Sequence, residues 1–223
     1  MLRGWKTHMH RTLSALFVVA VAACSSVPHV ANPSSDAPEA RYLAATPVKP
    51  ASSYAEALQV WRDAYDLNAW IGARFEYDSS RAILLSETQR AKSGPLPIHT
   101  PEDFFAAPRG VCVDLTRFAV DTLRVIDPQS EPVFLMIEFA PVSIAGNTLR
   151  LHWLAMYRRN EGHYFFADSK RPGHIAGPYA TVGQFIQEYA QYRGREVVSF
   201  REVESYERKM RKQATNQYRE ERP

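Results

Sequence analysis

The stretch Gly110–Ile126, GVCVDLTRFAVDTLRVI, decides the fold predicted for this chain. Its spacing predicts a helix that starts at Cys112 and has one buried face. The residues of that face are Leu115, Phe118, Ala119, Thr122 and Ile126. Asp127-Pro128 ends the helix, because proline disfavours helical geometry in the residue before it. A cysteine therefore begins a helix that must pack on another layer.

A sheet is the layer that we expect. Pro132–Phe139 is almost wholly apolar, which is typical of a strand buried on both faces. The triplet Ala145-Gly146-Asn147 predicts a turn. Thr148–Tyr157 and His163–Asp168 are predicted as strands, because Asn160-Glu161-Gly162 between them is a hairpin signal. These segments form an antiparallel sheet.

Helices surround this core. Tyr54–Phe75 has a helical period with Ser52 or Ser53 as its N-cap. Thr100-Pro101 starts a short helix, and Thr181–Tyr192 forms another. Ser199 to about Arg219, rich in Glu, Arg and Lys, is predicted as a charged helix. Helices, then an antiparallel sheet, then a closing helix indicate an α+β domain.

The N-terminus is typical of an exported protein. Arg3, Lys6 and Arg11 precede the apolar run Leu13–Ala23, which is too short to span a bilayer. Val21-Ala22-Ala23-Cys24 resembles the lipobox of bacterial lipoproteins, which implies lipid on Cys24 and a membrane anchor. A plain signal peptide ending near a cysteine is the alternative. We expect a signal peptide at 1–23, a lipidated cysteine and Pro/Ser/Ala-rich linker at 24–52, a domain at 53–198 and the charged helix at 199–223.

Charge gives no sign of a nucleic-acid partner. Removing the 23 residues before Cys24 from the 223 leaves 200, enough for one domain with a substantial core. The three basic residues in the removed segment account for the formal charge of +3, so 24 basic residues then face 24 acidic ones. A neutral chain lacks the electrostatic attraction that supplies non-specific binding to nucleic acid.

Cys112 is the candidate nucleophile. The unsatisfied N–H groups and positive dipole end of a helix N-terminus favour a thiolate and can stabilise an oxyanion. Gly110 lets the backbone approach a substrate closely, and Asp114 has a structural role in the first turn. The alternative is that Cys112 is a small buried hydrophobic residue.

A cysteine nucleophile needs a base, and the base needs a residue that orients it. His152 is the better candidate because it stands in mid-strand, where histidine has no propensity reason to be, while His163 starts the next strand. A hairpin symmetric about Asn160 places His152 opposite Asp168, on the same face. A register shift of one residue would place them on opposite faces.

These motifs resemble those of the transglutaminase-like superfamily, including its bacterial cysteine peptidases. The resemblance rests on Gly110–Asp114, on His152-Trp153, and on Tyr164–Asp168. It implies a papain-like fold with the nucleophile helix on an antiparallel sheet, and the roles of nucleophile, base and orienter for Cys112, His152 and Asp168. Tyr77 and Trp153 are weaker candidates for oxyanion or substrate binding.

There are departures from the family pattern. Trp153 directly follows His152, where many members have an intervening residue, and the acidic calcium-binding cluster of some periplasmic members is not evident. We therefore expect no metal and no cofactor.

The expected function is amide hydrolysis in the cell envelope. The substrate would be a protein, a peptide or a peptidoglycan-linked amide, and the enzyme would be lipid-anchored on the periplasmic side of the inner or outer membrane. Ser25 and Ser26 after Cys24 favour the outer membrane in a Gram-negative host. A protein-crosslinking transglutaminase with the same triad and a non-catalytic lipoprotein that binds a partner are the alternatives. The sequence leaves oligomeric state open.

Overall fold

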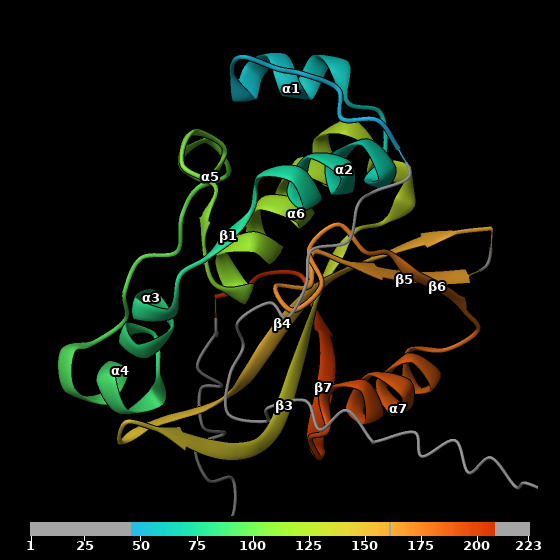
Figure 1. Cartoon of the computed structure of the whole chain (residues 1–223). Helices are drawn as coiled ribbons and strands as arrows, with labels where there is room; N and C mark the ends of the chain where they lie inside the picture. The colour runs from blue at the N-terminus through green and yellow to red at the C-terminus, as the bar shows by residue number, and fades with distance from the viewer. Residues whose placement is uncertain (1–45, 161, 208–223) are drawn as a thin grey trace, which may run out of the picture.

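A five-stranded antiparallel sheet organises the domain in the computed structural model, which describes residues 46–160 and 162–207 (Figure 1). The strands lie in the order β6-β5-β4-β3-β7. Their bounds are Val133–Ile144 for β3, Asn147–Arg159 for β4, Gly162–Phe166 for β5, Ala176–Tyr179 for β6 and Val197–Val203 for β7. The expected α+β class, with the Cys112 helix packed on an antiparallel sheet, is confirmed.

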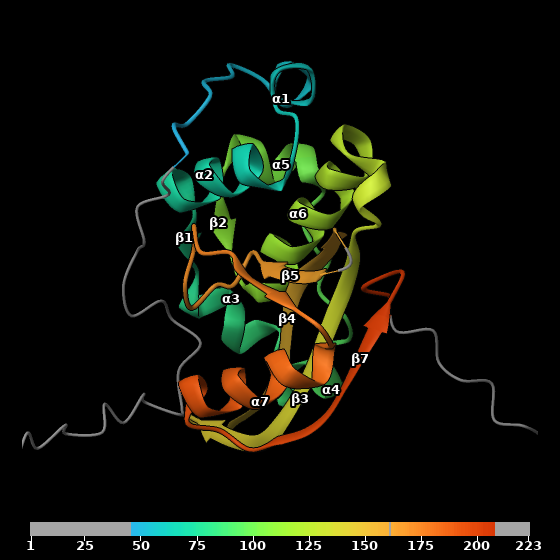
Figure 2. The ribbon, with the colours of Figure 1, turned by 90° about the vertical axis from the view of Figure 1, so that its right-hand side faces the viewer.

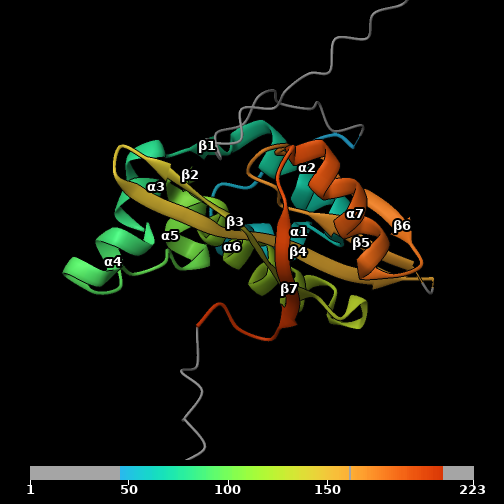
Figure 3. The same cartoon turned by 90° about the horizontal axis from the view of Figure 1, so that it is seen from below.

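Helices cover both faces of the sheet (Figure 2). One face carries α1 (Tyr54–Val60), α2 (Ala64–Arg74), α5 (Pro101–Ala106) and α6 (Cys112–Ile126), and the other carries α7 (Val182–Arg193). Between α2 and α6 the chain forms β1 (Glu76–Tyr77), α3 (Ser79–Leu84), α4 (Glu87–Ser93) and β2 (Arg109–Gly110), and the 3-10 turn η1 (Pro128–Ser130) follows α6. Helices α3 and α4 lie at the far end of the β3–β4 hairpin, and β7 is an edge strand (Figure 3).

Alternate residues of β4 enter two separate hydrophobic cores. Ala155 and Tyr157 pack with the helices on the α6 side, whereas Leu154 and Met156 pack with α7. The reason is the two-residue period of a strand, which sends successive side chains to opposite faces. Parity along this part of β4 thus decides which of the two cores a side chain enters.

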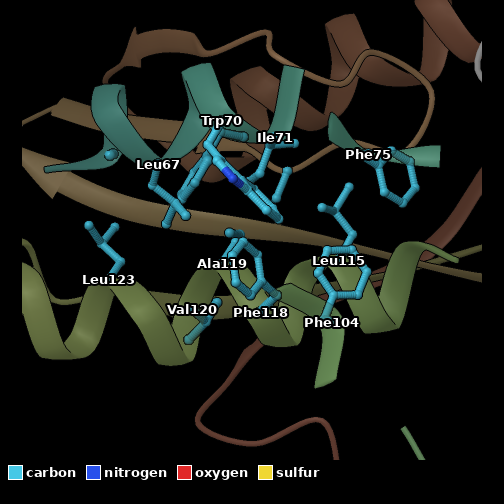
Figure 4. Packing of buried hydrophobic residues seen from close by; sticks show 14 of the residues in the cluster. Leu67, Trp70, Ile71, Phe75, Phe104, Leu115, Phe118, Ala119, Val120 and Leu123 are labelled. Atoms are coloured by element: carbon cyan, nitrogen blue, oxygen red, sulfur yellow. The ribbon is translucent and has the colours of Figure 1, made fainter. Parts of the chain in front are cut away.

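The larger core is built where α2 crosses α6 (Figure 4). Trp70 and Ile71 of α2 face Leu115, Phe118 and Ala119 of α6, and all five are at most 5% exposed. Aromatic packing dominates, with the Trp70 and Phe118 rings 5.0 Å apart between centroids. The predicted buried face of the Cys112 helix is confirmed at these positions.

The start of α6 is held by a buried carboxylate, that of Asp114. Arg81 of α3 donates to it through Nε and Nη2, each at 2.7 Å. The backbone N–H groups of His99 and Val111 also donate to it, at 3.1 and 3.0 Å. Asp114 is fully buried, so this carboxylate has exchanged all of its water for protein donors. The expected structural role of Asp114 is confirmed.

The predicted continuous helix over Tyr54–Phe75 is wrong, because the chain forms two helices there. Helix α1 ends at Trp61, whose backbone is extended. Asp63 then caps α2, its side chain accepting from the N–H groups of Tyr65 and Asp66. An aspartate competes for backbone donors in this way, which favours a new helix start over continuation. Ser53 caps α1, as expected.

The predicted helix from Ser199 is also wrong where the structure describes it. Val197–Val203 is strand β7, paired antiparallel with β3. The backbone of β3 offers hydrogen bonds on the edge away from β4, and Val197, Val198, Phe200 and Val203 are β-branched or aromatic residues that favour a strand at that edge. Residues 208–223 of the predicted helix lie outside the described residues.

Replacing Asp114 by alanine is expected to lower the free energy of unfolding by about 3 kcal/mol, because it leaves the Arg81 charge and two N–H groups without this acceptor. Urea unfolding followed by circular dichroism measures the change. Asp121 on the same helix is the matched control, since it is about one-third exposed and its ion pairs with Arg117 and Arg124 are 3.5 and 3.6 Å long. Asp121→Ala is expected to cost about 1 kcal/mol or less. Equal losses would contradict the role assigned to Asp114.

Candidate functional site

Cys112 is the first residue of α6 and is 7% exposed. Val111 before it is extended, so the thiol stands where the free N–H groups of a fifteen-residue helix begin. Tyr77 lies close to Gly110, two residues before Cys112, because the two residues pair in the two-stranded β1–β2 ladder. The structure therefore places the weak oxyanion candidate beside the segment that leads into Cys112.

Gly110 has a packing reason to be glycine. A Cβ at this position would lie 2.9 Å from both Cβ and Oδ2 of Asp114. Any larger residue would displace the carboxylate that holds the helix start. The close approach accommodated by Gly110 in this structure is therefore that of Asp114.

His152 and Asp168, sixteen residues apart in sequence, meet in the folded chain. Nε2 of His152 lies 3.2 Å from Oδ1 of Asp168, and both residues are almost fully buried. The Lys170 N–H donates to the same Oδ1 at 2.9 Å, and the Arg171 guanidinium lies 3.6 Å from Oδ2. These contacts fix the carboxylate in place against the imidazole.

The predicted strand pairing, which set His152 directly opposite Asp168, is wrong, because the β4–β5 register is shifted by one residue. Ala155 pairs with Phe166 and Arg159 with Gly162, a register that would set His152 opposite Ser169 if the strands continued. Strand β5 ends at Phe166, however, and Ala167 adopts a positive φ of 57°. This left-handed residue breaks the alternation and turns Asp168 toward His152.

The lowered pKa of Asp168 bears on which ring nitrogen of His152 carries a proton. Burial alone would raise the pKa of this carboxyl group, but the hydrogen bond and charge of His152, with the charges of Arg193 and Arg171, hold it well below its usual range. An ionised carboxylate only accepts hydrogen bonds, so the contact with Asp168 favours the tautomer of His152 in which Nε2 is protonated. In a neutral His152 the lone pair is then on Nδ1.

Two residues at this site were missed by the sequence reasoning. The Tyr189 hydroxyl lies 2.9 Å from Nε2 of His152, and Nη1 of Arg193 donates to that hydroxyl at 2.9 Å. Their signal is present in the sequence: Arg193 continues the apolar face of the Thr181–Tyr192 helix one turn after Tyr189. A charged residue on an apolar stripe points to a buried polar partner.

The structure groups the predicted residues on two faces of the sheet. His152 pairs with Ile137, and its contacts with Tyr189 and Phe139 lie in the α7 core. Trp153 points to the other face, where it packs against the α6 core. Cys112 begins the helix on that second face, and within 46–160 and 162–207 no hydrogen bond joins its thiol to His152. The fold thus brings His152, the candidate base, to Asp168, and places the candidate nucleophile Cys112 on the other face of the sheet.

A cavity of about 350 Å³ opens beside the His152–Asp168 pair on the α7 side. Arg171 and Tyr189, which both contact the pair, are among its lining residues, as is His174. Burial lowers the pKa of His174, and the nearby charge of Arg171 lowers it further. The walls of this cavity therefore combine one arginine, one glutamate (Glu188) and one histidine with several aromatic side chains.

Metal ligands and a membrane span were also sought in the described residues. No group of three or more His, Cys, Asp or Glu side chains there could hold a metal ion. No helix in that part of the chain is both long and apolar enough to cross a bilayer. Cys24 lies outside the described residues.

Comparisons with known proteins gave no match to this chain. No protein-family description, curated protein or solved structure matches it.

Acid is expected to weaken the protein through Asp168. Since the folded pKa lies below the unfolded value of about 3.9, this group contributes stability above that pH, and the contribution is lost as pH falls toward the folded value. The difference in unfolding free energy between the parent protein and Asp168→Asn should therefore be largest near neutrality and shrink between about pH 5 and 3. Urea titrations at pH 7, 5 and 3 measure it.

Asp121→Asn is the control with the opposite sign. Burial raises the pKa of Asp121, so its carboxyl group favours the folded state at low pH, and that contribution is lost as pH rises. A pH-independent difference for Asp168→Asn would contradict the ionised pair described above.

Proposed function

We propose that this protein is an exported, lipid-anchored cysteine enzyme that transfers acyl groups through Cys112, His152 and Asp168. The observation that carries the proposal is the buried His152–Asp168 contact, in which the acid engages Nε2. The same contact would orient a general base in a nucleophilic triad. A transglutaminase-like core, with Cys112 at the start of a helix on an antiparallel sheet, is the finer fold that we propose.

The proposed chemistry has two halves. The Cys112 sulfur attacks an amide carbonyl while Nδ1 of His152 takes the thiol proton, and N–H groups at the start of α6 stabilise the oxyanion. The C–N bond then breaks, the amine leaves with the proton from His152, and a thioester remains. Water, deprotonated by His152, attacks the thioester and releases the acid and the thiol.

Hydrolysis of an envelope amide is the outcome that we propose. The substrate class is a protein, a peptide or a peptidoglycan-linked amide, and the anchor is lipid on Cys24, on the periplasmic side of the inner or outer membrane. If a primary amine replaces water in the second half, the same thioester gives a protein crosslink, and the enzyme is a transglutaminase. The two differ only in which acceptor reaches the thioester.

The proposed chemistry has one strict geometric requirement. The Cys112 thiol and Nδ1 of His152 must meet, although α6 and the His152 side chain lie on opposite faces of β4. This separation favours a second candidate function, that of a non-catalytic envelope lipoprotein that binds a partner. In that case the His152–Asp168–Tyr189 cluster serves to attach α7 to the sheet.

Thiol alkylation separates the two functions. In the full-length chain carrying Cys24→Ser, Cys112 is the remaining cysteine. The enzyme is expected to react with iodoacetamide at pH 7 while folded, and His152→Ala should slow the reaction by about tenfold or more, because the thiolate loses its base. Mass spectrometry of the peptide that contains Cys112 measures the rate.

His163→Ala is the matched control for that experiment. His163 is half-buried in β5 and contacts the Tyr179 carbonyl oxygen, so its loss should leave the Cys112 rate unchanged. A thiol that reacts only after unfolding, at one rate in all three proteins, would eliminate the enzyme and leave the lipoprotein without catalysis.

A further inference from the structure

Helix α7 presents to His152 a tyrosine and an arginine that the proposed triad chemistry does not use. Tyr189 and Arg193 are 1% and 2% exposed, one helical turn apart. The Tyr189 ring stacks on the imidazole, with centroids 5.9 Å apart and an interplanar angle of 25°. The Arg193 guanidinium lies over the ring of Phe139, 5.3 Å from its centroid. Both side chains are therefore held by packing as well as by hydrogen bonds.

The direction of each hydrogen bond follows from the donors present. Arg193 can only donate, so the Tyr189 oxygen accepts from it. A hydroxyl oxygen has a second lone pair, which can accept from Nε2–H of His152. When Nε2 carries the proton, the Tyr189 oxygen at 2.9 Å and Oδ1 of Asp168 at 3.2 Å are its two acceptors.

We propose that Tyr189 and Arg193 are positioning residues that hold the His152 ring with Nε2 protonated and that tune how readily the ring takes a second proton. Their effect on acyl transfer rests on the function proposed above, whereas their effect on His152 does not. Tyr189 stabilises the imidazolium as an acceptor. Arg193 destabilises it as a nearby positive charge and by drawing on the same hydroxyl oxygen.

Among the contacts described for residues 46–160 and 162–207, charged and titratable groups face His152 from two elements, and apolar groups from a third. They are Asp168 and Arg171 from the segment after β5, Tyr189 and Arg193 from α7, and the uncharged Ile137 and Phe139 from β3. Asp168 and the two arginines oppose one another in sign, and Tyr189 is the neutral member that contacts the ring directly. Substitutions on α7 can therefore change one influence on His152 at a time.

Titration of the His152 ring tests the proposal. The full-length chain with Cys24→Ser is labelled with ¹⁵N in histidine, and the His152 signals are assigned by their loss in His152→Gln. Tyr189→Phe is expected to move the titration midpoint down by about 0.5 to 1 pH unit, because the imidazolium loses an acceptor. Arg193→Met should move it up by a similar amount, because a positive charge is removed.

Two further variants serve as controls. Arg193→Lys keeps the charge and should bring the midpoint back toward that of the parent protein. Tyr179→Phe removes a hydroxyl that donates to Glu188 in the same layer, without contact to His152, and should leave the midpoint unchanged. The amide spectrum of each variant verifies that it is folded.

Opposite shifts in Tyr189→Phe and Arg193→Met, with Tyr179→Phe unchanged, would support the positioning role. Shifts of the same sign, or none, would overturn it. If a variant does not fold, the parent protein still decides: neutral His152 must show Nε2 protonated and Nδ1 unprotonated, and the reverse tautomer overturns the proposal. These NMR signals do not depend on catalysis. If the protein is inactive but the expected shifts are found, the positioning role of Tyr189 and Arg193 is supported, and only the proposed acyl transfer is refuted.

Discussion

The buried carboxylate of Asp114 is the interaction on which the rest of the domain depends. It joins the start of α6 to Arg81 of α3 and to the backbone at His99 and Val111. Helix α3 has no buried residue of its own, so it is the ion pair with Asp114 that ties it to the start of α6. Because the carboxylate is fully buried, each donor must stay in place to compensate its lost hydration. The position of α6, and with it that of Cys112, follows from this constraint.

The second organising feature is that one sheet serves two cores. Strand β4 sends Trp153, Ala155 and Tyr157 toward α6, and its alternate residues toward α7. His152 is of the second parity, so it becomes part of a buried polar cluster with Asp168 and α7. Because of this division, the proposed catalysis requires the Cys112 thiol to reach the His152 ring from the other face of the sheet. It also gives α7 a direct influence on the imidazole.

Much of the fold could be predicted from local signals. Thr100 caps α5 and Thr181 caps α7, because a hydroxyl at these positions satisfies a free N–H group of the first turn. The turn that includes Gly146 and the hairpin at Asn160 follow from glycine and asparagine, which tolerate positive φ. Strand β7 could not be predicted in this way. Val197, Val198, Phe200 and Val203 favour a strand locally, but the charged residues around them suggested a helix, and the edge of β3 that they pair with is distant in sequence.

The sequence by itself determined the helix that begins at Cys112, its apolar face, and the hairpin that brings the segments of His152 and Asp168 near each other. These depend on spacing and on turn chemistry, which are local. Only the tertiary structure decided how His152 and Asp168 meet, since the register is shifted by one residue and the positive φ of Ala167 compensates for it. The tertiary structure also decided which face of the sheet His152 occupies. Alternate residues of β4 point to opposite faces, and these faces differ only because α6 packs on one and α7 on the other.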